Sequence, residues 1–144
     1  MKQEGFRSQV LWAQIDGNLH LRHSAYADFA AQARIELLNG IGLDYKTIAA
    51  MKIGPILFRE ELIYLREVGL NDLVTVTTQL TKSSADGGRY SFRHEIFRGD
   101  GVKAAIVQVD GAWMDLVHRK LTALPQHFLV RLDEVPKSDD YQLG

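Results

Sequence analysis

One amphipathic segment early in the chain constrains the fold more than any other feature. From Ser24 to Leu38, apolar residues recur at steps of three and four, the spacing of a helix that buries one face. The positions that form this apolar stripe are Tyr26, Phe29, Ala30, Ala33, Leu37 and Leu38. Ser24 is of a residue type that often begins a helix, and Gly40 is of a type that often follows one. The remaining residues must therefore supply an apolar surface that covers this stripe.

The segments after this helix have the composition of β-strands. They are rich in β-branched and aromatic residues, and turns that contain Gly, Asn and Asp separate them. Strands are expected near residues 6–13, 56–68, 73–81, 89–98 and 102–117. A helix followed by strands that tight turns connect predicts an α+β fold, in which an antiparallel five-stranded sheet wraps around a long central helix. Regular alternation in the second strand predicts that Phe58 and Tyr64 share one face.

The length of 144 residues suits a single domain, 1–144, with an ordinary core. Hydrophobic residues make up 46% of the chain and charged residues 24%, which is typical of a globular protein. The polar residues 137–144 are expected to fray. The net charge of -1 favours neither nucleic acid nor an anionic surface as a partner. No apolar run approaches the length of a membrane span, so no membrane partner is expected.

The chain contains no cysteine, which excludes disulfides, thiolate metal ligands and a cysteine nucleophile together. This absence is compatible with a reducing cytoplasm, the location we expect. The sequence also has no glycine-rich phosphate loop, no Rossmann fingerprint and no HExxH pair. His20 and His23 have a spacing that can ligate a metal on a helix. No Cys or Glu lies beside them, however, so no metal site is expected.

The polar stretch before the helix contains the strongest candidate for a catalytic group. Asp16 is the only acidic residue in this loop. A carboxylate there could attack a carbonyl or activate water, while backbone N–H groups at His23 or Ser24 take the developing negative charge. The alternative is structural, because an Asp before a Gly commonly hydrogen-bonds the backbone of its own loop. The residues by themselves leave both interpretations open.

The stretch from Asp16 to Tyr26, DGNLHLRHSAY, resembles the signature of the 4-hydroxybenzoyl-CoA thioesterase-like branch of hotdog-fold proteins. That signature reads D-x-N-G-H-V-N-N-x-x-Y or D-x-x-G-x-V-x-H-x-x-Y, and a helix rich in Ala, Arg and Glu follows it. The ARIEL sequence at 33–37, Asp72 and the run from Trp113 to Pro125 are also similar to the family. The resemblance extends over roughly residues 8–130.

The positions that match are Asp16, Asn18, His20 and Tyr26 for the first form, and Asp16, His23 and Tyr26 for the second. The chain departs from the signature at Leu19, where the family has a glycine, which adopts positive φ far more easily than leucine does. Arg22–His23 replaces the usual Asn pair, and Gln14 replaces an acid that often precedes the catalytic one. These departures concern activity and substrate rather than the fold.

The resemblance implies a role for each matching residue. Asp16 is implied as the nucleophile or general base that acts on a thioester. His23 is implied to offer its backbone N–H, and its imidazole, to the carbonyl oxygen. The residues implied to bind substrate or shape its site are Asn18, His20, Tyr26, Phe58 and Glu60. For Glu60 a solvated or salt-bridged position on the strand is the structural alternative.

Together the residues and the resemblance predict an acyl-CoA thioesterase that uses no metal and no other cofactor. The resemblance further implies a homodimer, or a dimer of dimers, with the site at the subunit interface. One alternative is a hotdog protein that binds acyl-CoA or a protein partner without hydrolysis, which Leu19 and Gln14 favour. Another is a hotdog hydratase or dehydratase. The sequence does not specify the acyl group, because interface side chains set the depth of the pocket.

Overall fold

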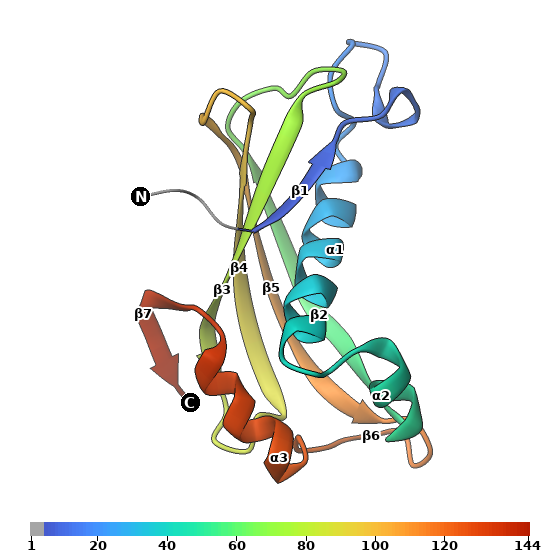
Figure 1. Ribbon diagram of the computed structural model, residues 1–144, viewed down its shortest axis with the longest axis vertical. Coiled ribbons are helices and arrows are strands. Elements are labelled where there is room, and N and C mark those ends of the chain that lie inside the picture. The colour runs from blue at the N-terminus through green and yellow to red at the C-terminus, as the bar shows by residue number, and fades with distance from the viewer. Residues whose placement is uncertain (1–4) are drawn as a thin grey trace.

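A curled sheet with one principal helix lying along it forms the body of the molecule (Figure 1). The computed structural model describes residues 5–144. The strands are β1 (Phe6–Gln9), β2 (Ile53–Tyr64), β3 (Leu73–Ser83), β4 (Arg89–Phe97), β5 (Lys103–Asp115), β6 (Lys120–Leu121) and β7 (Lys137–Leu143). The helices are α1 (Ala25–Gly40), α2 (Tyr45–Ala50) and α3 (Gln126–Leu129), with short 3₁₀ segments η1 (Trp12–Gln14) and η2 (Val130–Glu134).

The main path of the sheet has the order β1-β3-β4-β5-β2, and neighbouring strands along it are antiparallel. The expected α+β class and antiparallel sheet are therefore confirmed. Two short strands add to the expected five, since β6 pairs with β5 and β7 pairs parallel to β3. The first strand is shorter than expected because it ends at Gln9. Within residues 5–144, no helix has the length and apolar character needed to cross a membrane.

The C-terminal segment was expected to fray, and this prediction is wrong. Lys137–Leu143 form β7, which pairs with β3. The hydroxyl oxygens of Tyr141 and Ser83 lie 2.6 Å apart, and Ser138 is buried. The polar composition of residues 137–144 misled the prediction, because their order comes from backbone pairing at a sheet edge and from a few side-chain contacts.

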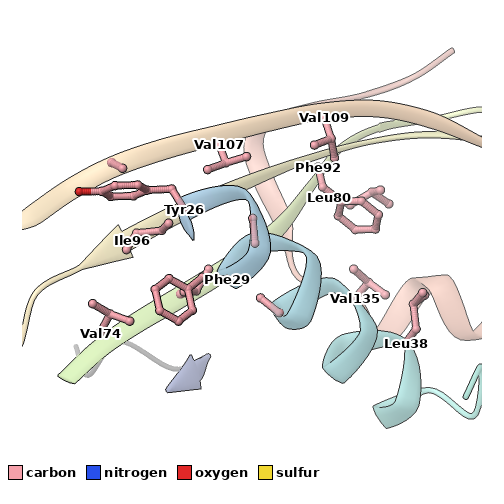
Figure 2. Close-up of a cluster of buried hydrophobic side chains, with 14 of the residues drawn as sticks. Tyr26, Phe29, Leu38, Val74, Leu80, Phe92, Ile96, Val107, Val109 and Val135 are labelled. Atoms are coloured by element: carbon pink, nitrogen blue, oxygen red, sulfur yellow. The ribbon is translucent and has the colours of Figure 1, made fainter. Parts of the chain in front are cut away.

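Helix α1 presents its apolar stripe to the sheet, as Figure 2 shows for Tyr26 and Phe29. The predicted stripe residues are buried except for Leu37, which is half-buried. Ala30 and Ala33 lie at the centre of this contact, where their small side chains let the helix pack closely on the strands. At 16 residues α1 has a moderate length, so the expectation of a long central helix is met only in part.

A β-bulge in β2 changes which side chains face α1. Phe58 is the extra residue, because its neighbours Leu57 and Arg59 pair with consecutive residues of β5. An inserted residue reverses the alternation beyond it, so Phe58 and Tyr64 do not share a face, contrary to the prediction. Leu57 and Tyr64 each line a hollow beside α1, whereas Phe58 lines a separate recess formed with β3, β4 and β5.

One fully buried histidine lies between α1 and the sheet. His94 of β4 has its Nε2 atom 3.0 Å from Nη1 of Arg34, on α1, and its Nδ1 atom 3.0 Å from Oγ1 of Thr78, on β3. Burial, helped by the positive charge of Arg34, lowers the pKa of His94 to about 3. The imidazole is therefore neutral near pH 7, and protonating it opposes folding.

This histidine should make the fold sensitive to mild acid. The unfolded chain binds a proton at this side chain below about pH 6.5, whereas the folded protein does so only near pH 3. Between pH 7 and pH 5 the free energy of unfolding should therefore fall by about 2 kcal/mol. In His94→Gln the fall over the same interval should be much smaller. Urea unfolding at each pH measures both values, and an equal fall in the two proteins would contradict this assignment.

Candidate active site

A recess of about 490 Å³ lies where the loop before α1 meets the end of β2, at the top of Figure 1. We call it the Asp16 recess; its lining residues are Asp16, His20, Leu21, His23, Tyr26, Tyr64, Leu65, Arg66 and Glu67. Backbone contacts join the two segments, since the Leu21 N–H donates to the Val68 carbonyl oxygen over 2.7 Å and His20 pairs with Gly69. The recess brings together four of the predicted site residues, namely Asp16, His20, His23 and Tyr26.

The carboxylate of Asp16 is oriented by its own loop. Its Oδ1 atom accepts the backbone N–H of Asn18 at 2.9 Å and that of His20 at 3.2 Å. These bonds are the ones expected if Asp16 only stabilises its own loop. They also fix the direction in which its carboxylate points. Within residues 5–144 no donor is bonded to Oδ2. One oxygen of a half-buried carboxylate is therefore free for chemistry in the Asp16 recess.

Leu19 has a strained backbone conformation within the turn that forms these hydrogen bonds. Its φ is 65°, in the left-handed region, at the position where the family signature has glycine. Its N–H donates to the Asp16 carbonyl oxygen over 3.1 Å, which closes the turn. A leucine in this region carries steric strain of roughly 1–2 kcal/mol. The side chain is exposed, so little packing offsets the strain.

Leu19→Gly should therefore raise the free energy of unfolding by roughly 1 kcal/mol, because relief of strain exceeds the added freedom of the unfolded chain. Urea unfolding at pH 7 measures the change. Leu11→Gly is the matched control, since Leu11 is also exposed but has φ of -99°. The control should be neutral or destabilising. If both substitutions destabilise the protein, Leu19 is not strained.

Backbone donors lie just before α1, and one of them belongs to His23, which lines the Asp16 recess. The Ala25 N–H donates to the Arg22 carbonyl oxygen at 3.0 Å, whereas within residues 5–144 the N–H groups of His23 and Ser24 have no acceptor. The Ser24 hydroxyl does not cap the helix and instead accepts a bond from Nε of Arg22 at 3.0 Å. Two donors therefore stand free at the positive end of the helix dipole, where an anionic oxygen is favoured.

Two tyrosines support this end of the helix. Tyr26 is buried, and its ring packs edge-to-face on Tyr64, with centroids 5.2 Å apart. The Tyr64 hydroxyl donates to the His23 carbonyl oxygen at 3.2 Å and so ties β2 to the helix start. Burial, reinforced by Tyr64 and by the charge of Asp16, raises the pKa of Tyr26, which therefore remains a neutral phenol.

Three predicted site residues lie outside the recess. Asn18 contributes only its backbone N–H to Asp16, and the ring of Phe58 lies 5.7 Å from the Arg89 guanidinium in another recess. Glu60 is exposed on β2, where its charge acts on Arg34. The bulge at Phe58 explains much of the difference, because alternation in the sequence gives no sign of an inserted residue.

The residues that sequence reasoning missed come from the end of β2. Tyr64, Leu65, Arg66 and Glu67 line the Asp16 recess, and Glu67 adds a second carboxylate to it. No local pattern marks these positions as part of a site. They reach it because the segment after β2 pairs with the loop before α1, a contact between distant parts of the sequence.

A second hollow, of about 220 Å³, lies between the second half of α1 and the sheet. We call it the helix cavity; its lining is mostly apolar and includes Ala31, Ile35 and Leu38 of α1, Pro55 and Leu57 of β2, and Phe92 of β4. Arg34 is its one basic lining residue. The hydroxyl of Tyr90, also in the lining, donates to the Ile56 carbonyl oxygen at 3.1 Å, and burial raises its pKa to about 12.

The arrangement suits attack on a carbonyl more than metal chemistry. A free carboxylate oxygen supplies a base or nucleophile, and the N–H groups at the helix start can stabilise an oxyanion. Among the described residues, no three His, Asp or Glu side chains are grouped as a metal site would require. His20 and His23 both line the Asp16 recess and are exposed, so either imidazole can meet a bound molecule.

Both the sequence and the fold match known proteins. The family profile of the thioesterase-like superfamily matches residues 10–132, whereas no curated protein matches the sequence. A hypothetical protein from Staphylococcus aureus in complex with CoA has a TM-score of 0.85 and 19% identity, covering 95% of this chain and 87% of that one. A 1,4-dihydroxy-2-naphthoyl-CoA thioesterase from Synechocystis has a TM-score of 0.80 and 20% identity, covering 90% and 94%. The probable thioesterase YbaW from Escherichia coli has a TM-score of 0.74 and 22% identity, covering 94% and 100%.

Proposed function

The chain belongs to the thioesterase-like superfamily and has a hotdog fold, which makes thioester hydrolase its enzyme class, and we propose that it hydrolyses an acyl-CoA to a carboxylic acid and CoA. One observation carries the proposal: Asp16, whose carboxylate has a free oxygen, lines the same recess as His23, whose backbone N–H has no acceptor within residues 5–144. The similar structures with CoA bound, or with a CoA thioester as substrate, support CoA thioesters as the substrate class.

In the proposed reaction, Oδ2 of Asp16 acts on the thioester carbonyl. As a general base it takes a proton from a water molecule, whose oxygen attacks the carbonyl carbon. As a nucleophile it forms an acyl anhydride that water then hydrolyses. On either route the carbon–sulfur bond breaks, and the CoA thiolate leaves and takes up a proton. The two N–H bonds to Oδ1 hold the carboxylate in place throughout.

The start of α1 supplies the oxyanion donors in this proposal. As the carbonyl carbon becomes tetrahedral, its oxygen gains negative charge that the His23 and Ser24 N–H groups and the helix dipole stabilise. Tyr26 and Tyr64 brace the helix start, and His20 borders the bound thioester. Asn18 acts through its backbone N–H, which orients Asp16.

The proposal includes a homodimer, or a dimer of dimers, built on β2. This strand ends the main path of the sheet, and large apolar side chains along it stay exposed, namely Leu57, Phe58, Ile63 and Tyr64. An exposed apolar edge strand favours pairing with another strand, and a second copy of β2 fits it antiparallel about a two-fold axis. Phe58 and Glu60 would then lie at the interface rather than in the Asp16 recess.

Such pairing would join the two hollows across the interface. The end of β2, at Tyr64, borders the Asp16 recess, and its start, at Pro55, borders the helix cavity. An antiparallel pair sets the end of one β2 beside the start of the other. The thioester would therefore react at Asp16 of one subunit while its acyl group enters the helix cavity of the partner. An apolar cavity of this kind suits an acyl group.

Release of free CoA thiol from a panel of acyl-CoAs tests the proposal. The panel should contain aliphatic chains of several lengths and an aryl-CoA, and we expect turnover without added metal or cofactor. If no member is hydrolysed by the folded protein, a hotdog protein that binds acyl-CoA without hydrolysis becomes the better description. Hydration of an enoyl-CoA instead would identify a hydratase. A cytoplasmic location stays a prediction that rests on the absence of cysteine.

A further inference from the structure

An arginine that forms no ion pair within residues 5–144 lines the mostly apolar helix cavity. Arg34 projects from α1 toward the sheet and is half-buried. Within residues 5–144 it forms no ion pair with a carboxylate, and its one side-chain hydrogen bond is to His94. Glu60 is near enough to act on its charge but makes no direct contact. A guanidinium has five donors, so most of them remain for another partner.

The bond to His94 positions Arg34 without neutralising it. Because arginine can only donate, Nε2 of His94 must accept, and Nδ1 must carry the proton and donate to Oγ1 of Thr78. This tautomer is the neutral imidazole, which agrees with its burial. The pair thus fixes one edge of the guanidinium against the sheet and leaves its positive charge without a bonded carboxylate in a mostly apolar setting, where Glu60 acts on it only from a distance.

A guanidinium that has no bonded carboxylate and lines a mostly apolar cavity favours an anionic ligand. A partly buried cation is stabilised when a carboxylate pairs with it, and the planar guanidinium matches a carboxylate through two parallel bonds. The cavity of about 220 Å³ exceeds the roughly 150 Å³ that holds a benzene molecule in an engineered protein core. It therefore has room for a ring-sized apolar group with a small polar end.

We propose that Arg34 is a specificity-determining residue, and that the helix cavity takes an acyl group of about ring size whose far end carries a carboxylate. The assignment of this group as acyl rests on the proposed thioesterase function. His94 is the positioning residue that holds Arg34. Neutral acyl groups of the same shape fill the cavity but leave the guanidinium unpaired, so they bind and react less well.

Binding of two near-isosteric fragments tests the site without requiring hydrolysis. Benzoate carries the carboxylate and benzamide does not, and NMR titration of the full chain gives the Kd of each. We expect benzoate to bind at least about tenfold more tightly than benzamide. Arg34→Met should remove this preference, whereas Arg7→Met, at an exposed arginine on β1, should keep it. Ala31→Trp, which fills the cavity from an exposed position on α1, should weaken both ligands.

Equal binding of the two fragments by the parent protein would overturn the proposal even if Arg34→Met does not fold. A preference that persists in Arg34→Met would also overturn it. A preference for benzoate that persists in Glu60→Gln supports the proposal, because Arg34 then binds the carboxylate without needing Glu60 to hold it in position.

Hydrolysis of a matched pair separates this inference from the proposed function. We expect kcat/KM for 4-carboxybenzoyl-CoA to exceed that for 4-carbamoylbenzoyl-CoA by about tenfold, and Arg34→Met to equalise them. If the parent protein hydrolyses the two thioesters with equal kcat/KM, the thioesterase proposal stands and the proposed role of Arg34 is wrong. If it hydrolyses no acyl-CoA, the proposed function fails, and the acyl assignment made here fails with it.

Discussion

Asp16→Asn should lower kcat for thioester hydrolysis at least about 10²-fold while leaving the fold intact, because it keeps the size of the side chain and removes the base or nucleophile. The amide oxygen can still accept the N–H bonds that orient Asp16 in the loop. Unfolding by urea should therefore show little change, and acyl-CoA should still bind. Steady-state kinetics of CoA release, with the same acyl-CoA for parent and variant, gives the ratio.

Two further variants show whether the effect belongs to Asp16. Glu67→Gln removes the other carboxylate of the Asp16 recess and should leave kcat within a few-fold of the parent. His23→Ala keeps the backbone N–H, so it should cost less than Asp16→Asn. If His23→Ala lowers kcat more than Asp16→Asn does, the imidazole of His23 is the general base. Full activity of Asp16→Asn would show that the proposed mechanism is wrong.

Gly111→Ala should destabilise the protein by about 3 kcal/mol, at the upper end of the usual range for overpacking. Gly111 lies on β5 opposite the bulge of β2. A Cβ atom there would lie 2.6 Å from the Tyr90 hydroxyl oxygen and closer still to the carbonyl oxygen of Ile56. These two groups are hydrogen-bonded to each other, so neither can move without breaking that bond. Urea unfolding measures the loss of stability.

Gly40→Ala is the matched control for this substitution. Gly40 ends α1, and within residues 5–144 no atom outside its neighbours in the chain and the adjacent helix backbone lies within 4 Å of the Cβ that alanine would add. Alanine also favours a helix more than glycine does, so the control should be neutral or slightly stabilising. Equal effects at the two positions would mean that the hydrogen bond between Tyr90 and Ile56 does not keep these groups close to Gly111.

The elements that sequence reasoning placed well are those with local, regular patterns. The apolar stripe of α1 is one example, because a period of 3.6 residues is visible within a short window and Tyr26 and Ala30 are buried accordingly. Strands β3, β4 and β5 are another, since turns mark their ends. Asp16, His20 and His23 share one recess because they lie on one short loop and the helix start that follows it.

The features that sequence reasoning missed depend on contacts between distant parts of the chain or on a break in the alternation of a strand. The bulge at Phe58 reverses the faces of β2, and it lies opposite Gly111 on another strand, about fifty residues away. Strand β7 is polar and gains order from its pairing with β3 and from a few side-chain contacts, such as that of Tyr141 with Ser83. The pairing of Arg34 with His94 joins two strongly patterned elements, α1 and β4, whose sequences give no sign that their polar side chains meet.

Hydrolysis by a mixed dimer shows whether Asp16 of one subunit acts on an acyl group held by its partner, as proposed. One subunit carries Asp16→Asn and the other carries Ala31→Trp, and different affinity tags allow the mixed dimer to be isolated. Each homodimer should be nearly inactive. The mixed dimer should recover about half of the parent activity per dimer, because one of its two sites then combines an intact Asp16 with an intact helix cavity. Activity no higher than that of the two homodimers would contradict the account, since it would place Asp16 and the cavity of each site in the same subunit.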